Sequence, residues 1–66
     1  MKTSYFTFGQ CHSHAHEGLT LDKDIVVEIT ADDPRERMFV LFGRMWAFEY
    51  DEPPDMALFP RGIVKI

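Results

Sequence analysis

The sequence of 66 residues predicts a small two-layer α+β domain of order ββαβ(β), with one helix packed on one face of a mainly antiparallel sheet of three to four strands. Three observations predict this class. Residues 34–42 have the apolar spacing of a helix, the segments on either side alternate as strands do, and Gly43 stands where the period changes. A helix and a sheet that are each apolar on one side bury those sides against each other.

The predicted helix, about 34–42, has both a start signal and a stop signal. Asp33 is the expected N-cap, Pro34 suits the first helical position, and Glu36 has capping-box spacing to Asp33. Gly43 is expected to end the helix in a left-handed conformation. The predicted buried face consists of Met38, Leu41, Phe42 and Met45. Because so short a helix is marginal by itself, packing on the sheet must stabilise it.

Alternation of apolar and polar residues predicts the strands. Residues 4–8, 24–30 and 46–50 are the main strands, residues 63–66 a last edge strand, and residues 56–59 a turn of helix or a cap on the core. The side chains expected to face the core are Phe6, Phe8, Ile25, Val27, Ile29, Trp46, Phe48 and Tyr50. Two strands joined by a loop are most simply antiparallel neighbours, which favours an antiparallel sheet with the first strand in the middle. The alternative, a parallel pair of the second and third strands, requires a right-handed crossover.

The sheet face away from the helix is expected to stay open, and it is the predicted partner-binding surface. Its expected residents are Tyr5, Thr7, Val26, Glu28, Ala47 and Glu49. Of these, the residues predicted to bind a partner are Tyr5, Thr7, Val26, Glu28 and Glu49. Six Phe, two Tyr and one Trp are many for one thin core layer. We therefore expect a leftover apolar patch that binds a partner or a second copy as a homodimer.

Composition predicts one domain over residues 1–66 and limits the classes of partner. The net charge of −4 disfavours nucleic acid and anionic membranes, which bind basic surfaces. The single cysteine, Cys11, excludes an internal disulfide and fits a reducing compartment. No signal peptide or membrane-spanning run is visible, so a cytoplasmic protein is expected.

Residues 10–23 lack both periods, which predicts a long polar loop, and this loop contains a histidine triplet. In an extended backbone, His12, His14 and His16 would project to the same side. Imidazoles bind zinc, and Cys11 or Glu17 can add a fourth ligand. One alternative function is therefore a metal-binding module or minimal metal-dependent hydrolase. Because the chain has no second ligand cluster, a polar loop without metal is the preferred interpretation.

Catalysis without metal has little support in the sequence. Cys11 beside a histidine lacks an orienting third group and an oxyanion hole, so a non-enzymatic protein is expected. The aromatic residues Trp46, Phe48 and Tyr50 suggest a second alternative, single-strand nucleic-acid binding by stacking. Core packing explains these rings better, because the sequence shows no basic rim around them.

Two sequence patterns carry a resemblance to a known group of proteins. The segment Tyr5-Phe6-Thr7-Phe8-Gly9 with a following histidine, and the pattern Met38-Phe39, Phe42-Gly43, Trp46-Ala47-Phe48-Glu49-Tyr50, resemble small open reading frames of tailed bacteriophages and prophages. The resemblance covers about two-thirds of the chain, but not the histidine loop or the proline-rich segment after Tyr50. It implies a phage accessory protein in the bacterial cytoplasm that binds a host protein, for example in defence or transcription.

Overall fold

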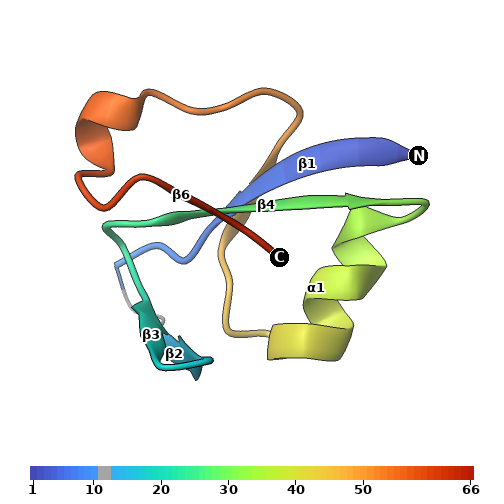
Figure 1. The fold of residues 1–66 in the computed structure, drawn as a ribbon, viewed down its shortest axis with the longest axis horizontal. Coiled ribbons are helices and arrows are strands. Elements are labelled where there is room, and N and C mark those ends of the chain that lie inside the picture. Colours follow the sequence, from blue (N-terminus) through green and yellow to red (C-terminus); the bar gives the residue numbers. More distant parts are fainter. Residues whose placement is uncertain (11–12) are drawn as a thin grey trace.

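The computed structural model describes residues 1–10 and 13–66 and shows a two-layer α+β domain (Figure 1). Its elements are β1 (Lys2–Thr7), β2 (His14–His16), β3 (Leu19–Leu21), β4 (Val26–Ala31), α1 (Pro34–Phe42), β5 (Phe48–Tyr50), the 3₁₀ turn η1 (Met56–Leu58) and β6 (Ile63–Lys65). The nine residues of α1 are too few for a bilayer crossing, and no other helix in the described residues has the required length and apolarity.

The main sheet has the strand order β5-β1-β4-β6. Strand β1 pairs antiparallel with both β4 and β5, which confirms the prediction that the first strand lies in the middle. Strand β6 adds a parallel edge next to β4. Figure 1 shows α1 on one side of this sheet and the returning segment 51–62 on the other. Helix α1 thus covers part of one face of the sheet, and the returning segment covers part of the other.

Helix α1 begins and ends where its capping residues predict. The Asp33 carboxylate accepts a hydrogen bond from the Glu36 N–H at 3.2 Å, and Pro34 occupies the first turn. At the other end Gly43 has φ 60° and its N–H donates to the Phe39 carbonyl at 3.0 Å. A residue with a Cβ is strained in this conformation, so glycine fits the helix end.

The core lies between α1 and the sheet. It consists of Phe6, Phe8, Leu21, Ile25, Val27, Ile29, Met38 and Phe42, with Leu41 and Trp46 packed against its margin. The predicted helix face is therefore confirmed at Met38 and Phe42 and is half-buried at Leu41. Met45 is exposed instead of buried, because the helix has already ended at Phe42.

The predicted long loop contains a small hairpin. Strands β2 and β3 pair antiparallel, with His14 opposite Leu21 and His16 opposite Leu19. Glu17 and Gly18 form the turn, and both have positive φ, 51° and 84°, as a two-residue type I′ turn requires. Leu21 is fully buried in the core, so the hairpin is anchored to the domain at one end.

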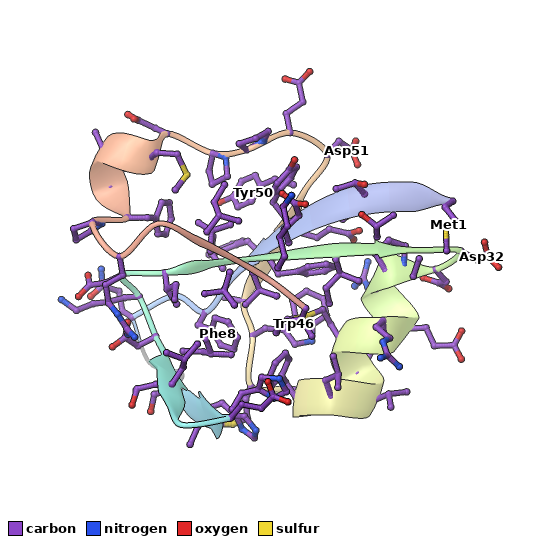
Figure 2. The ribbon with its side chains drawn as sticks, in the orientation of Figure 1. Met1, Phe8, Asp32, Trp46, Tyr50 and Asp51 are labelled. Atoms are coloured by element: carbon purple, nitrogen blue, oxygen red, sulfur yellow. The ribbon has the colours of Figure 1, made fainter. Side chains whose placement is uncertain are left out.

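The predicted inward side of the aromatic strand is confirmed at Trp46 and is wrong at Phe48 and Tyr50. Trp46 packs on the core side, with its ring 5.2 Å from that of Phe6, whereas Phe48 and Tyr50 are exposed on the other face. Thr7 is opposite Phe48 in the strand register, and its carbonyl also accepts from the Ala47 N–H at 2.8 Å. Two residues thus oppose one, as in a β-bulge, and the side chains change face between Trp46 and Phe48. Figure 2 shows Phe8 and Trp46 on the helix side of the sheet and Tyr50 on the opposite side.

Candidate protein-binding groove

The sheet face predicted to be open is only partly open. Thr7 and Val26, expected at the surface, are buried, with 3% and 0% of their area exposed. The segment that returns through η1 lies over this face (Figure 1), and it joins the sheet where the Val26 N–H donates to the Gly62 carbonyl at 2.9 Å. Tyr5 and Glu28 do lie on this face and are half-buried. The expectation of a flat, solvent-exposed sheet is therefore wrong.

Two other residues assigned to the open face need correction. Glu49 is opposite Phe6 in the register, and Phe6 points into the core. Glu49 therefore lies on the helix side of the sheet, where it is half-buried at the edge. Ala47 is half-buried beside Trp46, Phe39 and two arginines instead of on the far face. Both corrections follow from the change of face at the bulge.

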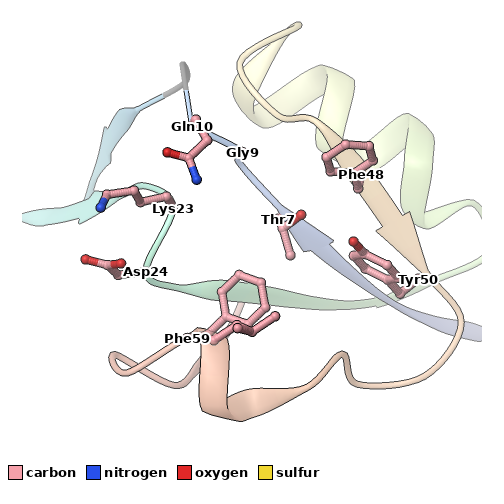
Figure 3. A pocket seen from close by; sticks show the side chains of 9 residues that line it. Thr7, Gly9, Gln10, Lys23, Asp24, Phe48, Tyr50 and Phe59 are labelled. Atoms are coloured by element: carbon pink, nitrogen blue, oxygen red, sulfur yellow. The ribbon is translucent and has the colours of Figure 1, made fainter.

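A groove of about 420 Å³ remains where the returning segment does not reach β5. It is lined by Thr7, Gly9, Gln10, Lys23, Asp24, Phe48, Tyr50, Leu58 and Phe59. Figure 3 shows Thr7 between the two walls, with Phe48 and Tyr50 on one side and Phe59 on the other. The side chains of Gln10, Lys23 and Asp24 gather at one end (Figure 3).

One part of the groove is apolar and aromatic. Phe48 is 58% exposed and Leu58 is 69% exposed, so the two walls present large apolar side chains to solvent. The rings of Phe48 and Tyr50 lie 6.5 Å apart on the same face. Aromatic rings that are held by a strand bind apolar groups at low entropic cost, because they have few rotatable bonds.

The other end of the groove is polar. Lys23 is exposed and Asp24 is half-buried, and within the described residues neither side chain has an ion-pair partner within 4.0 Å. An ammonium, a carboxylate and the Gln10 amide together offer both donors and acceptors. The main chain of a partner also carries donors and acceptors, its N–H and C=O groups. This end of the groove can therefore bind the partner's main chain whatever its side chains are.

Arg61 fixes the wall that carries Leu58 and Phe59. Its guanidinium donates to the Thr20 carbonyl and lies 3.4 Å from the Asp22 carboxylate. The backbone N–H of Arg61 donates to the Asp24 carbonyl at 3.0 Å. These contacts tie the turn after η1 to β3 and to the start of β4. The groove is consequently held by hydrogen bonds between segments that are far apart in the sequence.

Tyr5 and Glu28 are neighbouring polar residues on this sheet face. They are opposite each other in the β1–β4 register, and Lys65 lies 3.8 Å from the Glu28 carboxylate. Desolvation raises the pKa of the Tyr5 phenol, and the charge of Glu28 with a hydrogen bond to it adds to the effect.

The histidines predicted as metal ligands have a structural role where they are described. His14 and His16 project to the same side of β2, as expected, and both rings meet Phe42 edge-on at 5.1 and 5.4 Å. Cys11 and His12 lie outside the described residues. Among the residues that are described, no group of three His, Cys, Asp or Glu side chains can hold a metal ion. The zinc hypothesis therefore stays a prediction about the complete triplet.

Sequence reasoning missed most of the groove. Gln10, Lys23 and Asp24 were assigned to a loop or a strand start, and Leu58 and Phe59 to a short cap. Their convergence depends on the returning segment, which no local pattern reveals.

Comparison of the chain with protein-family models, curated proteins and solved structures gives no match.

Proposed function

We propose that this chain is a non-enzymatic accessory protein that binds a host protein and modulates its activity, by holding an extended segment of that protein in the groove. The resemblance to small phage open reading frames suggests a bacterial host, and defence or transcription as the affected process. The supporting observation is the pair of exposed apolar walls, Phe48 on β5 and Leu58 on η1, on either side of an open groove.

The chemistry of the groove favours a peptide over a small polar ligand. An apolar side chain of the partner would fit between Phe48, Tyr50 and Leu58, where water is displaced from aromatic surface. The neighbouring main chain would bind Gln10, Lys23 and Asp24 at the polar end. A rigid groove next to an edge strand is a common way to recognise extended segments.

The experiment compares three tagged baits in bacterial lysate and then measures affinity with the captured, purified protein. Leu58→Asp places a charge on the apolar wall, and Val40→Asp makes the same kind of change on the exposed side of α1, which is on the other sheet face. We expect the wild type and Val40→Asp to bind equally and Leu58→Asp to bind at least about tenfold more weakly. Equal binding by all three baits, or no protein enriched by the wild type, would refute the proposal.

One observation favours single-strand nucleic acid as a second candidate. Arg35 and Arg44 line a hollow of about 320 Å³ together with Phe39 and Trp46, and the Arg35 guanidinium lies 5.7 Å from the Trp46 ring centre. This is the basic rim that the sequence did not reveal. Anisotropy of a labelled single strand at low salt tests it: binding has to appear there and decrease with Arg35→Glu.

A further inference from the structure

The hollow beside helix α1 is a positive site on an acidic protein. It has a volume of about 320 Å³ and is lined by Arg35, Phe39, Arg44, Trp46 and Ala47. Among the described residues this lining has two cations and no carboxylate, although the chain has a net charge of −4. The acids near the start of α1 line a different depression, which contains Asp32, Asp33 and Glu36. The hollow therefore attracts an anion that the rest of the surface repels.

The indole of Trp46 is held in place without a ligand. Its Nε1–H donates to the Gly43 carbonyl at 3.1 Å. Its ring centre lies 5.2 Å from that of Phe6 and 5.3 Å from that of Phe39, in edge-to-face contacts. Phe39 is nevertheless 45% exposed, so aromatic surface remains for a ligand at the hollow. Side chains that are already ordered lose little entropy on binding.

The two arginines supply the charge that an anion needs. The Arg35 guanidinium lies 5.7 Å from the Trp46 ring centre, and a guanidinium over a ring keeps the N–H groups in its own plane for acceptors. In the described part of the chain, neither Arg35 nor Arg44 has an ion-pair partner within 4.0 Å. Arginine binds phosphate through two parallel hydrogen bonds, and a terminal phosphate carries close to two negative charges at neutral pH.

We propose that the hollow binds one nucleoside monophosphate, with the phosphate on Arg35 and Arg44 and the base against the exposed ring of Phe39. The proposal rests on the second candidate function, single-strand binding, and deepens it. Size and charge favour one nucleotide over a long strand. A hollow of about 320 Å³ is small among ligand sites, and each further phosphate of a strand would meet the net charge of −4. The ligand is then a free mononucleotide or the phosphorylated end of a strand.

Calorimetric titration with AMP, adenosine and inorganic phosphate tests whether both halves of the ligand are needed. We expect AMP to bind at least about tenfold more tightly than either of the others, because it alone contacts the arginines and a ring together. Trp46 is the sole tryptophan of the chain, so a change in its fluorescence with AMP places the ligand in the hollow. No binding of AMP, equal binding of adenosine or phosphate, or heat without a change in Trp46 emission would overturn the proposal.

Arginine variants test the phosphate site. Arg35→Gln and Arg44→Gln each remove one charge, and each is expected to weaken AMP binding at least about tenfold. Arg37→Gln is the matched control, because Arg37 is exposed on the same helix and does not line the hollow; AMP binding should stay within about twofold. Leu58→Asp, in the groove, should also keep AMP binding. Circular dichroism checks folding. Equal losses at all three arginines, or no loss at Arg35 and Arg44, would contradict the assignment.

Competition with strands separates this proposal from single-strand binding. Two oligoadenylates of equal length, one with a 5′-phosphate and one with a 5′-hydroxyl, compete with AMP for the protein. Displacement of AMP by the phosphorylated strand alone identifies a strand end as the ligand. Displacement by neither strand identifies a free nucleotide, so the proposal stands while the second candidate function fails. Equal displacement by both strands would retain single-strand binding and overturn the preference for a terminal phosphate.

Discussion

The imidazole of His14 meets the ring of Phe42 edge-on, with the ring centres 5.1 Å apart and the planes at 79°. Phe42 is the last residue of α1, and it also contacts His16 and Phe8 in the same edge-to-face manner. The hairpin β2–β3 and the end of the helix are therefore joined by aromatic packing. Two of the three histidines predicted as metal ligands, His14 and His16, thus pack against the end of the helix.

Replacement of either histidine by alanine is expected to lower the free energy of unfolding by about 1 kcal/mol, the usual value of an aromatic pair. Urea denaturation measures the loss. Ala15→Ser, on the exposed side of the same strand, serves as the control and is expected to change nothing measurable. If His14→Ala in a Phe42→Leu background costs as much as in the wild type, the two rings are not coupled.

Stability in alkali is expected to depend on Tyr5. Its phenol has a raised pKa in the folded chain and an ordinary pKa of about 10 when unfolded. Protons are then bound more tightly by the folded state, so this stabilisation is complete below pH about 10 and is lost as the pH rises through the folded pKa. The comparison of urea unfolding for wild type and Tyr5→Phe at pH about 8 and about 11 isolates the effect.

The wild type should lose more stability than Tyr5→Phe between the two pH values. Absorbance titration of Tyr50→Phe, which leaves Tyr5 as the sole phenol of the chain, reports the pKa directly. An ordinary pKa in that variant, or parallel pH profiles for wild type and Tyr5→Phe, would contradict the expectation. The Glu28→Gln substitution is expected to lower the Tyr5 pKa, because it removes the neighbouring negative charge.

The buried hydroxyl of Ser4 is expected to be a weakness of the core. Its side chain is fully buried, and the Oγ atom has no hydrogen-bond partner among the described residues. A buried polar group without a partner costs free energy, so Ser4→Ala is expected to stabilise the fold by about 1 kcal/mol. Thr3→Val is the control, because the Thr3 hydroxyl is bonded to that of Thr30 at 2.7 Å and its removal should not stabilise. A destabilised Ser4→Ala protein would show that the hydroxyl is satisfied.

The features that sequence predicts well here are local. Asp33, Pro34 and Gly43 define the helix within a few residues of themselves, and the helix has the predicted bounds. The side on which Phe48 and Tyr50 lie depends on the pairing of Ala47 and Phe48 with Thr7, about forty residues away. The alternation from Trp46 to Tyr50 is the same with or without a bulge, so the sequence cannot distinguish the two faces.

The groove was unpredictable for a similar reason. Lys23 and Leu58 line the same groove because Arg61 and the segment before it return across the sheet and bond to residues near β3 and β4. The Pro53-Pro54 pair marks a break in regular structure, because proline lacks the N–H that a strand or helix needs, but it does not show the direction that the chain takes. A sequence pattern that marks a break carries no information about where the chain goes next.

At the hairpin turn the residue type and the backbone conformation also disagree, which predicts a stabilising substitution. Glu17 occupies a left-handed conformation with φ 51°, which a side-chain-bearing residue adopts at a cost, and glutamate is not a usual residue there. Glu17→Asn would create the Asn-Gly pair that type I′ turns prefer, so the free energy of unfolding is expected to rise by about 1 kcal/mol. Glu17→Val should lower it, since a β-branched residue tolerates this conformation least. Urea denaturation of the three proteins gives the order Asn, Glu, Val from most to least stable; any other order means that residues 17 and 18 do not form this turn.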